Sequence, residues 1–311
     1  MVRVCRFVDY CSFSLQGEKM KKIAISFSGG RSSAVMTLLV LQKYPDADIQ
    51  ITFANTGFEH EDTLRFVDAC DRNLFGGRVV WIEAVINQEP GIGVGFKVVN
   101  YETAARDGEP YIAGVRKYGL WNKTNSSCTA RLKVEPMQKY LKTKGFVRGK
   151  HLNHFTAIGI RADEIDRLSV NRLRDKVVYP LVEAGVNKRE VLRQCAKWDF
   201  DLRIDEHYGN CVGCFKKSTR KLATIARDTP EYFEKWRMIE EELKDFKKQN
   251  NYDPATNFRR IYRKYMTVDD LVQIGSDSGF RGFSSAEKDS QGYMFDDFDL
   301  ETGCGESCEI Y

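Results

Sequence analysis

Five short apolar runs recur along the first 180 residues, and helix-like stretches separate them. The runs are KKIAISF (21–27), DIQITFANT (48–56), GRVVWIEAV (77–85), HFTAIGI (154–160) and KVVYPLV (176–182). Each has the length of a buried strand, whereas the segments between them have helical spacing. Strands that alternate with helices are typical of a parallel sheet wrapped by helices on both faces. The pattern therefore predicts an α/β fold built on a five-stranded, mostly parallel sheet.

The same pattern divides the chain into four parts. Residues 20–205 form the predicted α/β domain, in which a glycine-rich and polar stretch at about 85–127 indicates an insertion at one edge of the sheet. Beyond about residue 205 no strand pattern is left, and 206–275 are expected to form a helical subdomain that contains cysteines. Residues 1–19 are interpreted as an N-terminal extension, and the acidic segment 276–311 as a flexible tail.

Composition and charge narrow the class of protein. The chain has 311 residues, of which 42% are hydrophobic, and it contains no run near the ~20 apolar residues that span a membrane. We therefore expect a cytoplasmic protein that makes no membrane contact. Its nine cysteines are then expected to serve metal, cluster or redox chemistry rather than disulfides. Cys70 and Cys195 are exceptions, because they lie in helical patterns where a thiol packs as a small apolar group.

Charge leaves the nature of the partner open. The net charge is +4, and basic residues gather at 139–151, 216–221 and 259–265. An anionic partner such as a nucleic acid fits these clusters, and so do solvated helix faces.

The segment SFSGGRSSA (26–34) carries the first chemical signal. It places two glycines between the first strand and a helix, so that backbone N–H groups are left unpaired at the positive end of the helix dipole. Such a turn suits a phosphate group, because glycine lets the backbone approach the anion and hydroxyl and guanidinium groups add donors. It matches neither the Walker pattern nor the dinucleotide fingerprint. The candidate phosphate ligands are Ser26, Ser28, Gly29, Gly30, Arg31, Ser32 and Ser33.

SFSGGRSSA resembles the SGGxDS PP-loop of the adenine-nucleotide alpha-hydrolase superfamily. The segment FANTGFEHEDTLRFV (53–67) is similar to the one after the second strand in the branch of phosphoadenosine phosphosulfate (PAPS) reductases. GIRADEIDRLS (159–169) and YPLVEAGVNKREVLRQC (179–195) resemble two later motifs of that branch. The likeness extends over about residues 22–240, and it is specific for the superfamily rather than for the substrate.

The resemblance implies an adenine nucleotide, either ATP with Mg²⁺ or, alternatively, PAPS or adenosine phosphosulfate (APS). It implies that Asn55, Thr56 and Gly57 flank the adenine and ribose. It also implies that Gly159 and Arg161 face the anionic groups, and that Arg161 closes the site together with Glu164.

One position departs from the motif. ATP-cleaving members have an aspartate that helps to hold Mg²⁺ where this chain has Ser32. Sulfonucleotide reductases of the same branch manage without that carboxylate. Whether ATP is cleaved is therefore left open, with Glu59, Glu61 or Asp163 as substitute carboxylates.

Three cysteines carry the second signal. Cys211 and Cys214 form a C-x-x-C pair, which permits two thiolates on one metal, and Cys128 precedes a helix-like stretch in SSCTARLK. In the resembled family the equivalent of Cys128 returns to the same site. Three cysteines with an open fourth position resemble the 4Fe-4S cluster of thiolation and DNA phosphorothioation enzymes. Zinc held with His207 is the alternative, and the apolar face of 230–243 is expected to pack over this region.

The favoured hypothesis is an ATP-dependent sulfurtransferase. The nucleotide would activate an oxygen of a tRNA or DNA acceptor by adenylylation, and sulfide from a sulfur donor would then displace AMP, with Arg31, Lys133 and Arg161 stabilising the phosphate charge. A rival enzyme would reduce PAPS or APS with Cys304 or Cys308 of the tail as nucleophile, and would need an electron donor. A third alternative is a non-catalytic nucleotide- or nucleic-acid-binding protein with a structural metal. A homodimer is left open.

Overall fold

The computed structural model describes residues 20–123, 125–243, 261–262 and 266–284. Within them a six-stranded sheet has the order β4-β3-β2-β1-β5-β6. The five predicted strands are all present and parallel to one another: β1 (Lys22–Ser26), β2 (Asp48–Asn55), β3 (Val79–Val85), β5 (Phe155–Ala157) and β6 (Val177–Val178). The predicted fold class is confirmed.

The sixth strand, β4 (Gly95–Val99), lies inside the predicted insertion and pairs antiparallel with β3. It is an edge strand whose side chains are mostly half-exposed or exposed, and Val98 is 56% exposed. An edge strand of this kind lacks the continuous apolar run of a buried strand, so the hydrophobic pattern did not predict it.

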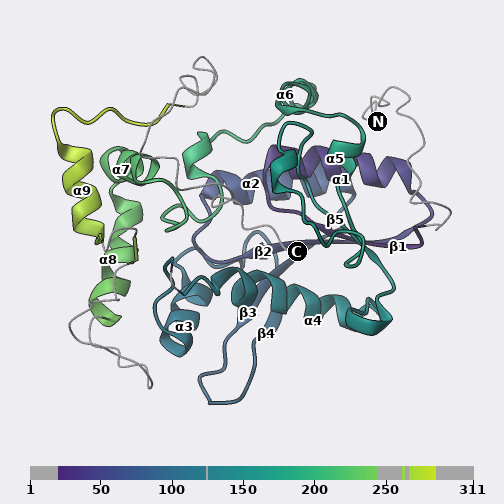
Figure 1. The fold of residues 1–311 in the computed structure, drawn as a ribbon, viewed down its shortest axis with the longest axis horizontal. Helices are drawn as coiled ribbons and strands as arrows, with labels where there is room; N and C mark the ends of the chain where they lie inside the picture. Colours follow the sequence, from purple (N-terminus) through teal and green to yellow (C-terminus); the bar gives the residue numbers. More distant parts are fainter. Residues whose placement is uncertain (1–19, 124, 244–260, 263–265, 285–311) are drawn as a thin grey trace.

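Helices cover both faces of the sheet (Figure 1). One face carries α1 (Arg31–Lys43), α2 (Glu61–Cys70), α5 (Pro180–Glu183) and α6 (Lys188–Cys195), and the other carries α3 (Glu109–Tyr118) and α4 (Glu135–Thr143). Strand residues alternate between the two cores: Ile23 and Ile25 join the first, and Ala24 joins the second with Met137 of α4. Among the described residues no helix is long and apolar enough to cross a membrane.

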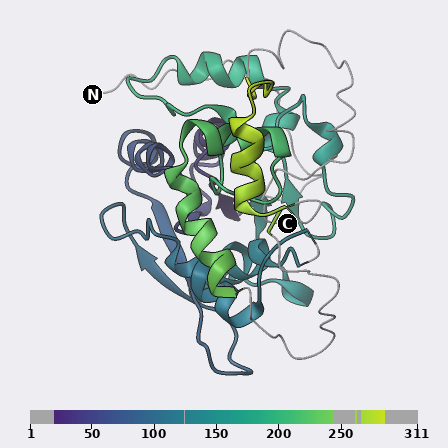
Figure 2. The ribbon, with the colours of Figure 1, turned by 90° about the vertical axis from the view of Figure 1, so that its left-hand side faces the viewer.

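Three further helices form a separate layer beside the end of the sheet: α7 (Thr219–Asp228), α8 (Glu231–Leu243) and α9 (Val268–Ser276) (Figure 2). They pack on one another, and their apolar side chains share a core with α3 and the C-x-x-C pair. Phe233, Trp236 and Ile239 are fully or almost fully buried in that core. The predicted packing face of 230–243 therefore does lie over the cysteines.

The parallel strands end at one common edge. Ser26, Asn55 and Ala157 are the last residues of β1, β2 and β5, and the segments that follow them carry the motifs singled out in the sequence. In α/β sheets the carboxyl edge is where ligands bind. The candidate site lies there.

Candidate functional site

The turn after β1 has the backbone geometry of an anion cradle. Gly29 has a φ of +79°, a left-handed conformation that favours glycine, and a Cβ there would lie 2.9 Å from Thr63 Cγ2. Gly30 is the extended residue before α1, and no side chain of the described residues caps this helix. The first N–H groups of α1 are thus left for a ligand, as phosphate binding requires.

Ser33 holds the turn in shape. Its hydroxyl accepts from the Ser28 backbone N–H at 3.3 Å and the Ser28 hydroxyl at 3.0 Å, and it donates to the Gly30 carbonyl at 2.9 Å. Ser33 is 4% exposed, whereas Ser28 is exposed and Ser26 and Ser32 are half-buried. The surface hydroxyls are therefore the ones that a ligand can reach.

The two predicted arginines differ in their surroundings. Arg31 Nε and Nη2 donate to the two Asp201 carboxylate oxygens at 2.7 and 2.8 Å, so an acidic partner neutralises its charge. Arg161 Nη1 donates to the Ser32 hydroxyl at 3.3 Å, and Arg161 Nε donates to Asp163 at 3.0 Å. The structure thus brings Arg161 to the phosphate turn itself.

Gly159 and Glu164 hold the segment that carries Arg161 against the turn after β1. A Cβ on Gly159 would lie 2.9 Å from Ser33 Cα, so only glycine lets the segment after β5 pack against the start of α1. Glu164 Oε2 accepts from the Arg161 backbone N–H at 3.2 Å and lies 3.4 Å from Arg161 Nη1. Glu164 therefore fixes the loop from which Arg161 extends.

The three carboxylates considered for Mg²⁺ have separate environments. Glu59 is buried beside Lys133, and Glu61 is bonded to Arg106 and Tyr101, which lower its pKa although burial acts in the opposite direction. Asp163 is exposed and shares Arg161 with Ser32. Of the three, Asp163 is the carboxylate at the phosphate turn.

The residues at the end of β2 and directly after it are committed to contacts within the fold. Asn55 is fully buried, and its Nδ2 donates to Glu83 Oε1 at 2.7 Å and to the Ala105 carbonyl at 2.9 Å. Gly57 has a φ of +84°, and a Cβ there would lie 2.8 Å from Gly108 Cα. Asn55 and Gly57 thus attach the predicted insertion to the sheet. Thr56, between them, faces a second part of the candidate site, a pocket.

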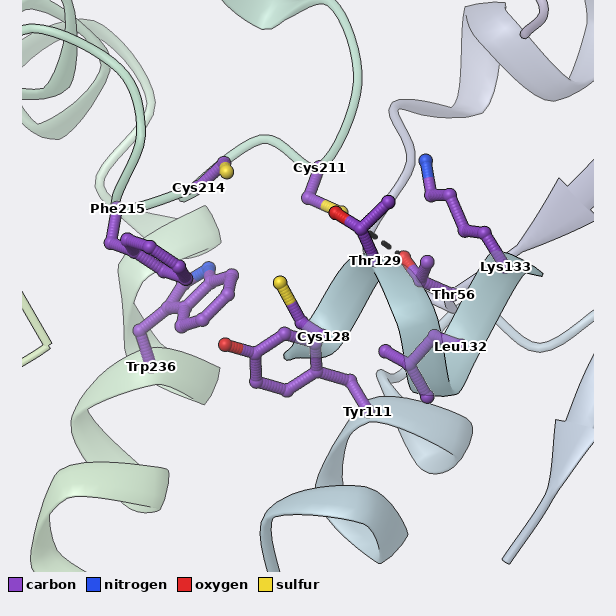
Figure 3. Close-up of a pocket in the computed structure, with 10 residues that line it drawn as sticks. All are labelled: Thr56, Tyr111, Cys128, Thr129, Leu132, Lys133, Cys211, Cys214, Phe215 and Trp236. Atoms are coloured by element: carbon purple, nitrogen blue, oxygen red, sulfur yellow. Dashed lines mark hydrogen bonds between the residues drawn. The ribbon is translucent and has the colours of Figure 1, made fainter. Parts of the chain in front are cut away.

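That second pocket is lined by all three predicted metal-binding cysteines (Figure 3). Cys128 and Thr129 begin a helical segment that continues through the π-helical turn Ala130–Val134 into α4. Cys128, Leu132 and Lys133 line the pocket together. Leu132 is four positions after Cys128 and shares its helix face, and the π-helical turn, whose hydrogen bonds span five residues, brings Lys133 to the same side.

The C-x-x-C pair approaches from the opposite side, and it is attached to the loop after β2. The Val212 N–H donates to the Phe58 carbonyl at 2.9 Å, and the Thr56 hydroxyl lies 3.3 Å from Cys211 Sγ. A Cβ on Gly213 would lie 2.1 Å from Trp236 Nε1, so the indole of α8 packs directly on the backbone of the pair.

A charged pair of the buried Glu59 and the half-buried Lys133 borders the thiols. Glu59 Oε2 accepts from the Thr56 N–H and hydroxyl, both at 2.8 Å, and Lys133 Nζ lies 3.8 Å from Glu59 Oε1. Lys133, which the sequence suggested for phosphate, thus lines the thiol pocket. Sequence reasoning attached no role to this Glu59–Lys133 pair.

Two polar groups in the pocket lack a partner within the described part of the chain. They are the Tyr111 hydroxyl and Trp236 Nε1. Tyr111 is 3% exposed, and burial, followed by the neighbouring thiols Cys128, Cys214 and Cys211, raises its pKa well above the ordinary value. No sequence signal points to Tyr111, because an isolated tyrosine in an insertion belongs to no motif.

The three thiols are ligands that suit a soft metal ion or an iron–sulfur cluster. Three thiols from two distant segments surround one apolar-lined space (Figure 3), and the two unpartnered donors lie beside it. In the present side-chain positions no three His, Cys, Asp or Glu residues of the described chain form a metal-binding group. Binding therefore requires the thiols to rotate toward a common point.

His207, the zinc ligand of the alternative hypothesis, is not among the residues that line the pocket. Its ring packs on Tyr208 and Phe283, and burial lowers its pKa. Cys70 and Cys195 lie in the core beneath α1, where burial raises their pKa, to about 12 for Cys195. These two thiols are packing groups, as predicted.

Cys304 and Cys308 lie outside the described residues, and so do the N-terminal extension and residues 285–311 of the predicted tail. Their predicted roles stay predictions.

Comparison with known proteins agrees with this geometry. The sheet order, the glycine turn and the arginine loop define a PP-loop α/β protein, and the model of the phosphoadenosine phosphosulfate reductase domain matches residues 22–174. The chain is 31% identical over 292 residues to an uncharacterized nin region protein, ORF290, of Escherichia phage lambda; the match covers 92% of this chain and 94% of that protein. The chain thus belongs to the PAPS reductase-like family of PP-loop proteins.

Two archaeal relatives are similar over part of their length. Uncharacterized proteins MJ0066 and MJ0973 of Methanocaldococcus jannaschii are 24% and 26% identical to the chain, over 75% and 79% of it. The matches cover 44% and 53% of those proteins. The family is one of nucleotide-binding enzymes of sulfur chemistry.

Proposed function

We propose that the protein is a cytoplasmic, ATP-dependent sulfurtransferase that thiolates a nucleic acid, either tRNA or DNA. The observation that carries this proposal is the convergence of Cys128, Cys211 and Cys214 on one pocket at the carboxyl edge of the sheet. The phosphate turn lies at the same edge. A sulfur centre and a nucleotide site side by side suit a reaction in which an activated acceptor receives sulfur.

In this proposal the phosphate groups of ATP bind the N–H groups at the start of α1 and the Ser28 and Ser32 hydroxyls. Arg161 stabilises charge on the phosphate, and Asp163 is the carboxylate available to Mg²⁺ in place of the motif aspartate. The acceptor oxygen attacks the α-phosphorus, and pyrophosphate leaves. Sulfide then displaces AMP from the acceptor, so that a carbon–oxygen or phosphorus–oxygen bond is exchanged for a bond to sulfur.

The three cysteines would hold a 4Fe-4S cluster in this proposal. When bound, such a cluster has one iron without a cysteine ligand, which supplies a place for sulfide. The protein's own contribution is a pocket with apolar walls, with the Glu59–Lys133 pair at its border. Lys133 is placed to attract an anionic sulfur species into it.

The test is anaerobic purification followed by analysis of iron, sulfide and zinc, and then incubation with ATP or PAPS. The proposal predicts iron and sulfide near cluster stoichiometry and the release of AMP and pyrophosphate from ATP. Colourless protein that converts PAPS to adenosine bisphosphate would overturn it in favour of a reductase, and a double variant Cys304→Ser/Cys308→Ser should then abolish that conversion.

A cysteine variant separates a catalytic metal from a structural one. Cys128→Ser should lose iron while it retains nucleotide affinity and most of its thermal stability. Cys195→Ser is the matched control, because Cys195 is also buried but lies in the core beneath α1. It should cost stability and leave the iron content unchanged. If Cys128→Ser instead unfolds the protein, the metal serves to stabilise the fold and the sulfurtransferase proposal loses its basis.

A further inference from the structure

We infer that Tyr111 and Trp236 donate hydrogen bonds to inorganic sulfur of the group held by Cys128, Cys211 and Cys214. The inference rests on the proposed function and extends it from the thiols to the donors beside them. It assigns a chemical property to the ligand: the ligand must present acceptors inside the pocket, in addition to accepting bonds from the three cysteines.

Tyr111 supplies the first observation. The residue comes from α3, it is 3% exposed, and its hydroxyl has no hydrogen-bond partner among the described residues. Its ring is fixed by edge contacts with Phe58 and Trp121, at centroid distances of 5.2 and 4.9 Å. Because three rings hold the phenol, counting Trp236 at 5.0 Å, the hydroxyl cannot turn to solvent. Figure 3 shows it at the edge of the pocket, pointing toward the Trp236 side chain.

Trp236 supplies an independent observation from another element. Its Nε1–H also has no partner within the described chain, and the residue is 1% exposed on α8. The indole is stacked on Phe58 at 4.4 Å and lies against the Gly213 backbone, so it too is fixed. Two rigid donors from two helices therefore border the space that the thiols surround.

A buried donor without an acceptor is unfavourable, and native proteins almost always satisfy such groups with protein, water or a ligand. The acceptor here must come from what occupies the thiol pocket. With zinc, only the cysteine sulfurs could accept, whereas the sulfide atoms of an iron–sulfur cluster are further acceptors, and hydrogen bonds to those sulfurs raise the reduction potential. The two donors thus fit a sulfide-bearing ligand.

Tyr111→Phe tests the inference, because it removes the hydroxyl and little else. Tyr140→Phe is the matched control: Tyr140 is also buried, and its hydroxyl lies 3.3 Å from Gln50 Oε1, outside the pocket. Each full-length protein is stripped of metal and then reconstituted anaerobically with iron and sulfide. The measurements are the cluster midpoint potential and the melting temperature before and after reconstitution.

The inference predicts two opposite shifts in Tyr111→Phe. Without metal the variant melts at the same temperature as the wild type or higher, because an unsatisfied hydroxyl is gone. With the cluster its midpoint potential is lower than in the wild type, and reconstitution raises its melting temperature by less. Tyr140→Phe shows neither the lower potential nor the smaller gain.

The failures are distinguishable. If the wild type assembles the cluster but Tyr111→Phe has the same potential and the same gain on reconstitution, the donor assignment is overturned and the sulfurtransferase proposal stands. If the wild type takes up no iron and sulfide, the proposed function is overturned, and the assignment of these donors to sulfur fails with it.

Discussion

The Thr56 hydroxyl lies 3.3 Å from Cys211 Sγ, although 155 positions separate the two residues in the chain. Thr56 directly follows β2, and Cys211 begins the C-x-x-C pair. This contact joins the sheet edge that carries the nucleotide motifs to the pocket that carries the thiols. It is a direct side-chain link between the two halves of the candidate site that the sequence treated separately.

Thr56→Val should weaken the hold on Cys211. The variant removes the hydroxyl that contacts both Cys211 and Glu59, and the loss of a buried hydrogen bond costs about 1 to 2 kcal/mol in the free energy of unfolding. Retention of iron during dialysis against a chelator should fall. Thr52→Val is the control, since Thr52 is equally buried on β2 but bonds the Ile25 carbonyl instead. Equal iron retention in both variants would contradict the prediction.

Gly213→Ala should disturb the thiol pair through Trp236. The added methyl group would sit 2.1 Å from Trp236 Nε1, which forces either the indole or the C-x-x-C backbone to move. Overpacking of this kind costs about 1 to 3 kcal/mol. The melting temperature and the iron content should both fall. Gly93→Ala, where the nearest atom is the flexible Lys139 end at 3.9 Å, should change neither, and an unchanged Gly213→Ala protein would refute the packing argument.

Gly159→Ala should impair nucleotide binding while the thiol pocket stays intact. Its methyl group would lie 2.9 Å from Ser33 Cα and would push the Arg161 loop away from the start of α1. We expect affinity for ATP to fall about tenfold, equivalent to about 1.4 kcal/mol, in a calorimetric titration. Iron content should match that of Gly93→Ala. A normal affinity would mean that the phosphate turn does not depend on this contact.

His154 should make the stability depend on pH. Burial, and then the charge of Arg148, lowers the pKa of His154 from 6.5 to about 4. The unfolded chain therefore takes up a proton at pH values where the folded protein does not, so stability is full above pH 6.5 and is lost as the pH falls toward about 4. The loss from this group should be about 1 to 2 kcal/mol.

Urea unfolding at pH 7 and pH 5 measures this loss. His154→Gln should have a flatter profile than the wild type between these pH values. His151→Gln is the control, because His151 is exposed, and it should follow the wild type. A wild-type slope in His154→Gln would assign the pH dependence to other groups.

The sequence predicted the parallel sheet because its strands are buried on both faces and therefore read as apolar runs. Ile23, Ile25 and Ile51 are at most 1% exposed. The edge strand β4 was missed for the opposite reason, since its side chains are partly exposed and its run is short. The phosphate turn was predictable because Gly29 adopts a left-handed backbone conformation, and that conformation favours glycine at this position of the sequence.

The thiol pocket was predicted only in part. The C-x-x-C pair has a recognisable spacing, but Tyr111, Trp236 and the Glu59–Lys133 pair come together only through tertiary packing. Nothing local constrains such residues, because their neighbours in space lie far away in the chain. Arg31 is the opposite case. It directly follows the glycine turn in the sequence, but its guanidinium group is bonded to Asp201, which lies 170 positions away.

The loop of residues 56–60 has one further consequence. It contacts Cys211 and Val212 on one side and continues into α2, whose Thr63 and Val67 lie against Gly29, on the other. If the proposed nucleotide and metal sites are coupled through this loop, the coupling is reciprocal: by whatever factor a metal-loaded thiol pocket tightens nucleotide binding, bound nucleotide tightens metal binding by the same factor. Protein that lacks the metal would then also bind the nucleotide more weakly.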